Sequence, residues 1–296
     1  MSRRRSRPCV GSALVLAALA ALAMLAATPP AAVAQGLVSQ SGNAPVTIHA
    51  TNGIEWNRDA RKYIARGDAV ATRNQATVRA DVLTAYYRDK SGDNGQDIYR
   101  VDATGNVRIT ANDQTALGDK GVYNVDQAVF VLKGKNLRFV SKQQTLTARD
   151  SLEYWEAKRL AVARGDAVLV KDDQRLHADI LTAHLVEKNG AKNADAKKAG
   201  AKPASGRKPN DVGESEIRQV DAFGNVYVSL RKAIVRGDRG VYIPQTGIAT
   251  ICGNVRVTSG KNQLNGECAE VNLNTSIYRL TGRARGLVIP KKKKGR

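Results

Sequence analysis

The side chains that could carry out chemistry are few in this sequence, and their spacing does not assemble a catalytic centre. The chain has three histidines and three cysteines among 296 residues. His177 and His184 stand where an earlier, similar segment has Arg79 and Tyr86, so the similarity does not extend to a histidine site. The sequence contains no glycine-rich phosphate loop, nucleophile elbow, Cys-x-x-Cys pair or His-Glu-x-x-His motif. We therefore expect a protein that is not an enzyme, with no catalytic residue, metal ligand or cofactor.

Carboxylates recur at matching places, Asp81 with Asp179 and Asp102 with Asp221. Each is the polar member of an alternating apolar and polar pattern, and no histidine or second carboxylate accompanies it consistently. A solvated sheet face explains these residues better than acid–base chemistry does.

The tripeptide Arg-Gly-Asp occurs at residues 66–68, 164–166 and 236–238 and suggests an adhesion motif at first sight. Two copies occupy equivalent places in a repeat, however, and the third matches a Gly-Asp at 118–119. Glycine permits positive φ, and aspartate can hydrogen-bond its own backbone. The pattern predicts bulges or tight turns.

Cys252 and Cys268 can pair if the chain is exported to an oxidising compartment. Their positions are symmetric about Gly260, which lies in a plausible turn, so a hairpin would place them opposite each other. Cα atoms in a non-hydrogen-bonded antiparallel pair lie roughly 4.5 Å apart, within disulfide range. Two buried thiols are the alternative; we favour a disulfide that clamps the end of the fold.

The sequence contains an internal duplication, and the residues discussed above lie within its repeated segments. Ile54–Val70 returns as Leu152–Val168 at an offset of 98, and Val101–Ile109 returns as Val220–Val228 at an offset of 119. An insert rich in Lys, Ala and Gly accounts for the difference. The expected organisation is a signal peptide at 1–34, an extension at 35–45, a repetitive domain at 46–289 and a basic tail at 290–296. Within the domain, repeat 1 spans about 46–139, repeat 2 about 146–257 with a basic insert at 188–215, and a partial repeat 264–289.

Inside each unit the apolar residues alternate with polar ones, which is typical of β-strands. Val78, Ala80 and Val82 illustrate the pattern, and Leu176, Ala178 and Ile180 keep it in the second copy. Turn signals separate such runs every 8 to 12 residues or so. The sequence predicts an elongated all-β fold of many antiparallel strands, a sandwich or a roll.

The N-terminus has the form of a secretory signal peptide. Arginines at positions 3, 4, 5 and 7 precede an apolar stretch from Val10 to Ala27, and Ala32-Val33-Ala34 fits a signal-peptidase site. Cleavage between Ala34 and Gln35 would release the protein outside the cytoplasm. The alternative is an uncleaved membrane anchor.

The net charge of +20 suggests nucleic-acid binding, but its distribution argues against that function. Much of the excess lies in the signal, the insert and the tail. We expect no nucleic-acid partner.

Three motifs together resemble the LptA/OstA family of periplasmic lipopolysaccharide-transport proteins. They are A-D-x-L-x-A at Ala80–Ala85, V-x-A-x-G-N-V-x-I at Val101–Ile109 and G-D-x-G-V-Y at Gly118–Tyr123, and the similarity covers about Val46–Leu287. The resemblance implies a β-jellyroll with an apolar slot between two sheets that holds lipid chains. It also implies lipopolysaccharide as ligand, an inner-membrane LptC-like partner, an outer-membrane LptD-like partner and end-to-end self-association. The basic insert and the tail depart from the family pattern.

Several functions remain open at this stage. A lipid-binding bridge between the two membranes fits best, while a membrane-anchored LptC-like partner and a translocon-domain homologue belong to the same pathway. From another class, a structural repeat protein of the envelope would carry no lipid. A glycan-acting enzyme on a β-solenoid would need clustered carboxylates, which the repeat lacks.

A slot lined by aliphatic residues suits acyl chains, because burial contributes about 0.8 kcal/mol per CH₂ and requires no specific donors. Alternation places one set of residues on the inward faces, where we expect lipid contact, and leaves Arg79, Arg108 and Arg175 facing outward. The inward set is Ile48, Ile54, Val78, Val82, Val101, Val107, Ile109, Leu146, Leu152, Leu176, Ile180, Val220 and Val226.

Overall fold

The computed structural model describes residues 46–73, 76–89, 95–111, 113–142, 144–187, 215–275 and 277–289. The predicted signal peptide, the extension before residue 46, nearly all of the basic insert and the tail lie outside these residues. Within them every regular element is a β-strand, which confirms the all-β prediction. The strands are β1 (Thr47–His49), β2 (Ile54–Asn57), β3 (Lys62–Arg73), β4 (Ala76–Asp89), β5 (Gln96–Ala111), β6 (Gln114–Asn124), β7 (Val129–Lys133), β8 (Arg138–Val140), β9 (Thr145–Thr147), β10 (Ser151–Trp155), β11 (Leu160–Lys171), β12 (Gln174–Glu187), β13 (Ser215–Ser229), β14 (Ile234–Ile243), β15 (Ile248–Ser259), β16 (Asn262–Asn272), β17 (Ile277–Thr281) and β18 (Arg285–Leu287).

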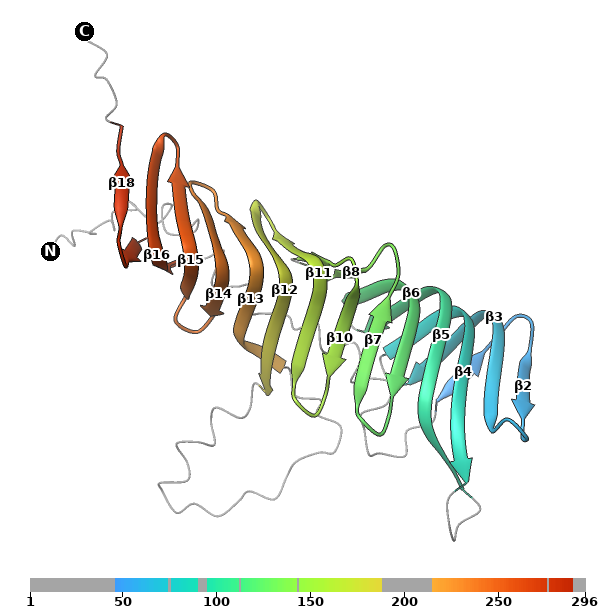
Figure 1. Ribbon diagram of the computed structural model, residues 1–296. Helices are drawn as coiled ribbons and strands as arrows, with labels where there is room; N and C mark the ends of the chain where they lie inside the picture. The colour runs from blue at the N-terminus through green and yellow to red at the C-terminus, as the bar shows by residue number, and fades with distance from the viewer. Residues whose placement is uncertain are drawn as a thin grey trace, which may run out of the picture.

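The long strands pair with their neighbours in antiparallel order, from β3 to β6 and from β11 to β16. The molecule is therefore elongated, with β2 and β3 at one end and β18 at the other (Figure 1). Such stacking leaves two distinct ends, as the repeat pattern predicts.

Short strands occur in pairs that divide the sheet lengthwise into two halves. β1 and β2 both pair with β3, β7 and β8 with β6, β9 and β10 with β11, and β17 and β18 with β16. Because β7 pairs with β10 and β8 pairs with β9, the ladder continues on both sides of the division. We call the two sides the β7–β10 half-sheet and the β8–β9 half-sheet. Together they form the β-jellyroll.

A corner in each long strand joins the two half-sheets. In β5 the corner lies at Gly105 (φ +78°), where an added Cβ would stand 2.0 Å from Oδ2 of Asp81 on β4. Asn106 Nδ2 donates to both carboxylate oxygens of Asp81, at 3.1 and 3.0 Å. The second repeat builds the same corner from Gly224-Asn225 and Asp179. Asp81 and Asp179 are therefore structural members of the corner.

The three Arg-Gly-Asp tripeptides also lie at corners. The strand registers shift between Arg66 and Ala69, between Arg164 and Ala167, and between Arg236 and Arg239, which confirms the predicted bulges. The first two glycines adopt positive φ. The third does not, and it fits its site because an added Cβ would lie only 2.5 Å from Ile251 Cγ2.

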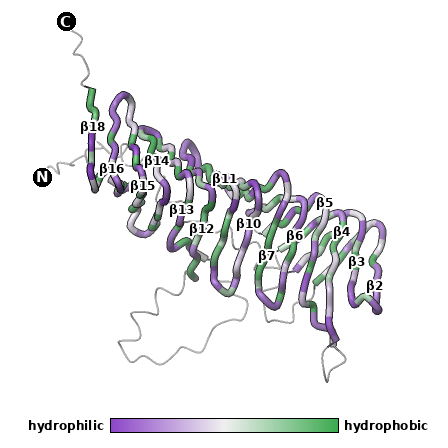
Figure 2. Tube along the Cα trace, in the orientation of Figure 1, coloured by the Kyte–Doolittle hydropathy of each residue, from purple (hydrophilic) through white to green (hydrophobic). Residues whose placement is uncertain are grey.

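Apolar side chains of the two half-sheets meet in the interior. In repeat 1 Leu83 and Leu132 from one half-sheet pack in one buried cluster with Val78, Ile109 and Phe139 from the other. Further clusters continue this interior through the second repeat and the C-terminal part. Figure 2 shows the alternation of polar and apolar residues along the strands that produces these clusters.

The corner changes which residues face the interior, and it corrects two predictions. Val82 and Ile180 were expected to face inward, but each is only partly buried. Leu83 and Leu181 join the buried clusters instead, at 7% and 6% exposure. Asp81 and Asp179 occupy the corner, so the alternation resumes one residue later than a straight strand would have it.

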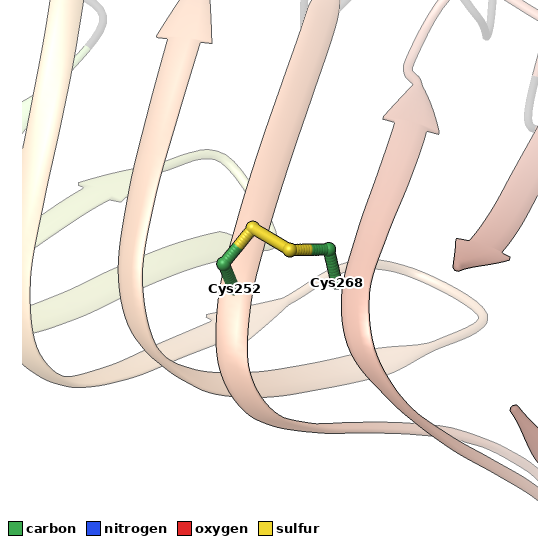
Figure 3. Close-up of a disulfide and its surroundings, with 2 residues drawn as sticks. All are labelled: Cys252 and Cys268. Atoms are coloured by element: carbon green, nitrogen blue, oxygen red, sulfur yellow. A yellow bond between two sulfur atoms is a disulfide. The ribbon is translucent and has the colours of Figure 1, made fainter. Parts of the chain in front are cut away.

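Cys252 and Cys268 form a disulfide across β15 and β16, with Cα atoms 4.1 Å apart (Figure 3). The hairpin closes at Ser259 and Asn262, one position away from symmetry about Gly260 alone. A register shift next to Cys252 compensates by one residue and brings the two cysteines opposite each other.

Candidate functional site

Two cavities lie between the half-sheets, one at the junction of the two repeats and one in the second repeat and the part that follows it. The middle cavity has a volume of about 920 Å³ and the C-terminal cavity about 790 Å³, each including space open to solvent. Leu169 and Val220 line both, so the two cavities adjoin. The middle cavity is lined by Ala116, Phe130, Leu132, Phe139, Gln144, Leu146, Leu152, Glu153, Tyr154, Ala161, Val162, Ala163, Leu169, Leu181, Thr182, Ala183, Ile217 and Val220. The C-terminal cavity is lined by Leu169, Lys171, Gln174, Arg175, Leu176, Val220, Ala222, Val226, Val228, Ser229, Leu230, Val235, Gly240, Val241, Tyr242, Ala249, Ile251, Val271 and Leu273.

Five residues of the predicted inward set lie in these cavity walls. Leu146 and Leu152 line the middle cavity, Leu176 and Val226 line the C-terminal cavity, and Val220 lines both. They come from β9, β10, β12 and β13, so alternation on four strands converges on one apolar space.

The first repeat uses its inward residues differently. Val78, Val107 and Ile109 are 9%, 1% and 2% exposed and pack within a buried cluster. Val101 is partly buried, two residues before buried Ala103 on the same face of β5. Around Val78, Val107 and Ile109 the interior of repeat 1 is filled by side chains of the same cluster.

Two predicted inward residues are exposed. Ile48 on β1 and Ile54 on β2 are 38% and 52% exposed. Among the described strands, β1 and β2 pair only with β3, at the end of the sheet (Figure 1). Alternation predicts on which face of a strand a residue lies, but whether that face is covered depends on the strands opposite.

The expected outward residues do not all behave alike. Arg79 and Arg108 are exposed, at paired positions on β4 and β5. Arg175 is exposed as well, yet it borders the C-terminal cavity together with Lys171 and Gln174. This end of β12 forms the polar margin of the cavity.

Sequence reasoning did not find Lys171 and Gln174. Lys171 follows Ala167 and Leu169 in the inward phase of β11, and Gln174 precedes Leu176 and Ala178 in that of β12. A polar residue standing in an apolar phase was the available signal.

Burial acts on the titratable groups of the cavity walls. It raises the pKa of Tyr242 in the C-terminal cavity to about 12, so the phenol stays protonated near neutral pH. In the middle cavity burial also acts on Glu153, but hydrogen bonds from Ser151, Arg164 and Trp155 outweigh it and hold the pKa of Glu153 below its ordinary value. These bonds measure 2.8, 2.8 and 3.1 Å. Glu153 is therefore a fully engaged carboxylate in the cavity wall.

His177 and His184 take part in side-chain pairs outside the cavities. His184 Nε2 lies 2.8 Å from Asp221 Oδ2, and Gln219 Nε2 donates to Asp221 Oδ1 at 2.6 Å. His177 Nε2 lies 3.8 Å from Asp166 Oδ1. In the described ranges no group of three or more His, Cys, Asp or Glu side chains is placed to hold a metal ion. None of the described segments forms a helix that could span a membrane.

The two half-sheets and the apolar space between them define the chain as an elongated β-jellyroll with an apolar interior. A family model described as LptA/(LptD N-terminal domain) LPS transport protein matches residues 47–150 and, a second time, residues 147–277. The two matches together span most of the sequence. The chain belongs to this family of lipopolysaccharide-transport proteins, as its motifs suggested.

Individual proteins that resemble this chain share less than a third of its residues in the aligned region. A protein of Rhizobium meliloti (strain 1021), described as uncharacterized, is 27% identical over 134 residues, which are 43% of this chain and 71% of that protein. Among solved structures, one match is the crystal structure of LptH, described as the LptA-homologous periplasmic component of the lipopolysaccharide transport device from Pseudomonas aeruginosa. It shares 16% identity at a TM-score of 0.35, covering 50% of this chain and 95% of the LptH chain.

Proposed function

We propose that this protein is a periplasmic bridge that carries lipopolysaccharide from an inner-membrane transporter toward an outer-membrane translocon, with the acyl chains held inside the jellyroll. The observation that carries the proposal is the pair of adjoining cavities, whose walls are mainly aliphatic side chains. Each buried CH₂ group of an acyl chain contributes about 0.8 kcal/mol without any specific donor or acceptor. Family membership in lipopolysaccharide transport supports this ligand.

Exposed apolar residues at both ends of the sheet support contacts with partners. Ile54 and Trp56 on β2 are 52% and 47% exposed, and Ile277 on β17 and Leu287 on β18 are 59% and 61% exposed. End strands also offer backbone groups for pairing with another sheet. These ends would join to LptC-like and LptD-like proteins, or to further copies of the chain, so that the apolar interior continues from one protein to the next.

Export is part of the proposal. The predicted signal peptide at residues 1–34 lies outside the described residues, so cleavage after Ala34 is a matter for experiment. Mass spectrometry of the periplasmic protein should find Gln35 at the N-terminus. A membrane-bound form that retains Met1 would instead favour the anchored, LptC-like alternative.

Site-specific photo-crosslinking in cells tests the lipid-binding function itself. A photoreactive residue at Leu176 or Val226, inside the C-terminal cavity, should capture lipopolysaccharide. The matched controls are the next residues on the same strands, His177 and Tyr227, which do not line either cavity. Crosslinks confined to the cavity positions support transport through the interior. Equal capture at both sets, or no capture in a folded protein, would favour the structural repeat protein that carries no lipid.

A further inference from the structure

Polar residues form a row across the inner face of the β8–β9 half-sheet, next to its hairpin edge. Lys171 pairs with Gln174 across the β11–β12 hairpin. The pairing of Val170 with Thr145 brings Gln144, one residue further along the same register, beside Lys171 on its other side. Gln144, Lys171 and Gln174 therefore lie side by side on three successive strands. We call them the polar row.

The polar row lies where the two cavities adjoin. Lys171 and Gln174 line the C-terminal cavity, and Gln144 lines the middle cavity. Leu169, two residues before Lys171 on the same face of β11, lines both. A single ligand with several chains could therefore reach both apolar spaces from the polar row.

Lys171 is buried without a partner of its own. Its residue exposure is 5%, and its Nζ makes no hydrogen bond within the described part of the chain. Gln174 Oε1 is likewise buried and without a hydrogen-bond partner there. Of the two acids in the adjacent turn, Asp173 pairs with Arg231 at 2.7 Å. Burial lowers the pKa of Lys171, and attraction by Asp172, the other acid, acts against this without reversing it.

Buried polar groups in proteins are normally paired, and a buried ammonium without a partner is costly. The same edge of repeat 1 has similar residues. Arg73 occupies the position equivalent to Lys171 at the repeat offset of 98, and the strand registers run from Arg73 through Ala76 and Ala111 to Gln114. Gln114 is 7% exposed, and its Oε1 is also buried without a partner in the described residues. The duplication keeps a cation at this place, although it does not keep the histidines.

We propose that Lys171, with Gln174 and Gln144 beside it, binds the acidic group, a phosphate or a carboxylate, of the lipid whose chains occupy the two cavities. The proposal rests on the lipid-binding function proposed above and assigns the residues that recognise the polar part of the ligand. An ammonium supplies up to three donors to an oxyanion. A glutamine amide donates to the same oxyanion and accepts from a neighbouring hydroxyl or amide group of the lipid. The aliphatic walls next to the polar row then accept the chains.

Isothermal titration calorimetry on the delipidated, exported chain separates the parts of this interaction. The ligands are lysophosphatidic acid, the monoacylglycerol with the same acyl chain, and inorganic phosphate. The unmodified protein should bind lysophosphatidic acid more tightly than the monoacylglycerol. Lys171→Met should weaken the binding of lysophosphatidic acid at least about tenfold, because hydrogen bonds to charged groups are strong. The affinity for the monoacylglycerol should stay unchanged.

Three further variants make the result specific. Lys171→Arg keeps the charge and should retain most of the preference for the phosphorylated lipid. Gln174→Leu keeps the approximate size of the side chain and should weaken the binding of lysophosphatidic acid to a smaller extent. Lys232→Met removes an exposed lysine at the same edge of the molecule and should change nothing.

Each other outcome overturns the proposal in a distinguishable way. If the monoacylglycerol binds and lysophosphatidic acid binds no more tightly, or if Lys171→Met weakens both equally, the polar row does not recognise the acidic group while the lipid cavity stands. If inorganic phosphate binds as tightly as the phosphorylated lipid, the polar row is a free-anion site. If neither lipid binds, the proposed function and this assignment fail together.

Discussion

Replacing Lys171 by methionine should make the lipid-free protein more stable. The substitution keeps the length and most of the shape of a side chain that is 5% exposed, and removes an ammonium whose Nζ makes no hydrogen bond in the described structure. Methionine adapts readily to irregular apolar surroundings such as the adjoining wall of Leu169 and Leu176. A residue retained for the stability of the fold would show the opposite effect.

The magnitude follows from the burial of a charge. Replacing buried ionic groups by apolar ones of similar volume often stabilises proteins by about 1–4 kcal/mol. Since Asp172 offsets part of the burial of Lys171, we expect the free energy of unfolding to rise by about 1–3 kcal/mol at pH 7. The exposed control Lys232→Met should stay within about 0.5 kcal/mol of the unmodified protein.

The stability difference between Lys171→Met and the unmodified protein should depend on pH. Burial lowers the pKa of Lys171 in the folded state, so the unfolded state binds the proton more tightly. The unmodified protein therefore gains stability as pH rises from the lowered folded pKa to the ordinary lysine pKa of about 10.4, and the advantage of Lys171→Met shrinks over that window. Urea denaturation of delipidated protein at pH 7 and at about pH 10 measures this difference. A variant that is less stable than the unmodified protein, or an advantage that does not decline with pH, would refute the argument.

Further predictions concern the corner, the disulfide and the core. Gly224→Ala should lower the free energy of unfolding by about 2–4 kcal/mol, because φ is +74° and the new Cβ would stand 2.0 Å from Asp179 Oδ2; Gly95→Ala, with open space around it, is the control. Non-reducing peptide mapping should find the disulfide within one chain, and replacing both of its cysteines by serine should cost about 3 kcal/mol, since the bond closes a loop of 16 residues. Leu132→Ala, at a fully buried position, should cost about 2–5 kcal/mol in the same denaturation assay.

Much of the fold was accessible from the sequence because the corner motifs and the strand alternation repeat. The matching of Ile54–Val70 with Leu152–Val168 predicted repeated strands, and the Arg-Gly-Asp tripeptides predicted bulges that the registers confirm. The face of Val82 and Ile180 was not predicted correctly. An alternation of two residues predicts the inward face of a straight strand. At a corner the register shifts, so the residues there interrupt the alternation, and the inward face resumes at a different residue.

The site was only partly accessible for a different reason. Alternation placed Leu176 and Val226 on an inward face, but whether an inward face is packed, hollow or uncovered depends on the strands opposite. In repeat 1 Val78 and Val107 pack within a buried cluster, whereas their counterparts in repeat 2, Leu176 and Val226, line the C-terminal cavity.

The polar row shows what the combination of pattern and geometry adds. In the sequence Lys171 is one of 47 basic residues, and only its phase relative to Leu169 sets it apart. In the structure the same lysine is buried at the meeting point of two apolar cavities, with Gln144 and Gln174 on either side. Selection for stability alone would favour an apolar residue at this position, because an unpaired buried charge destabilises the fold. A buried charge that lowers stability and lies against a cavity is best explained by a ligand of opposite charge. Binding of that ligand to the folded state would raise the free energy of unfolding of the protein. Lysophosphatidic acid should therefore raise the melting temperature of the unmodified protein more than that of Lys171→Met.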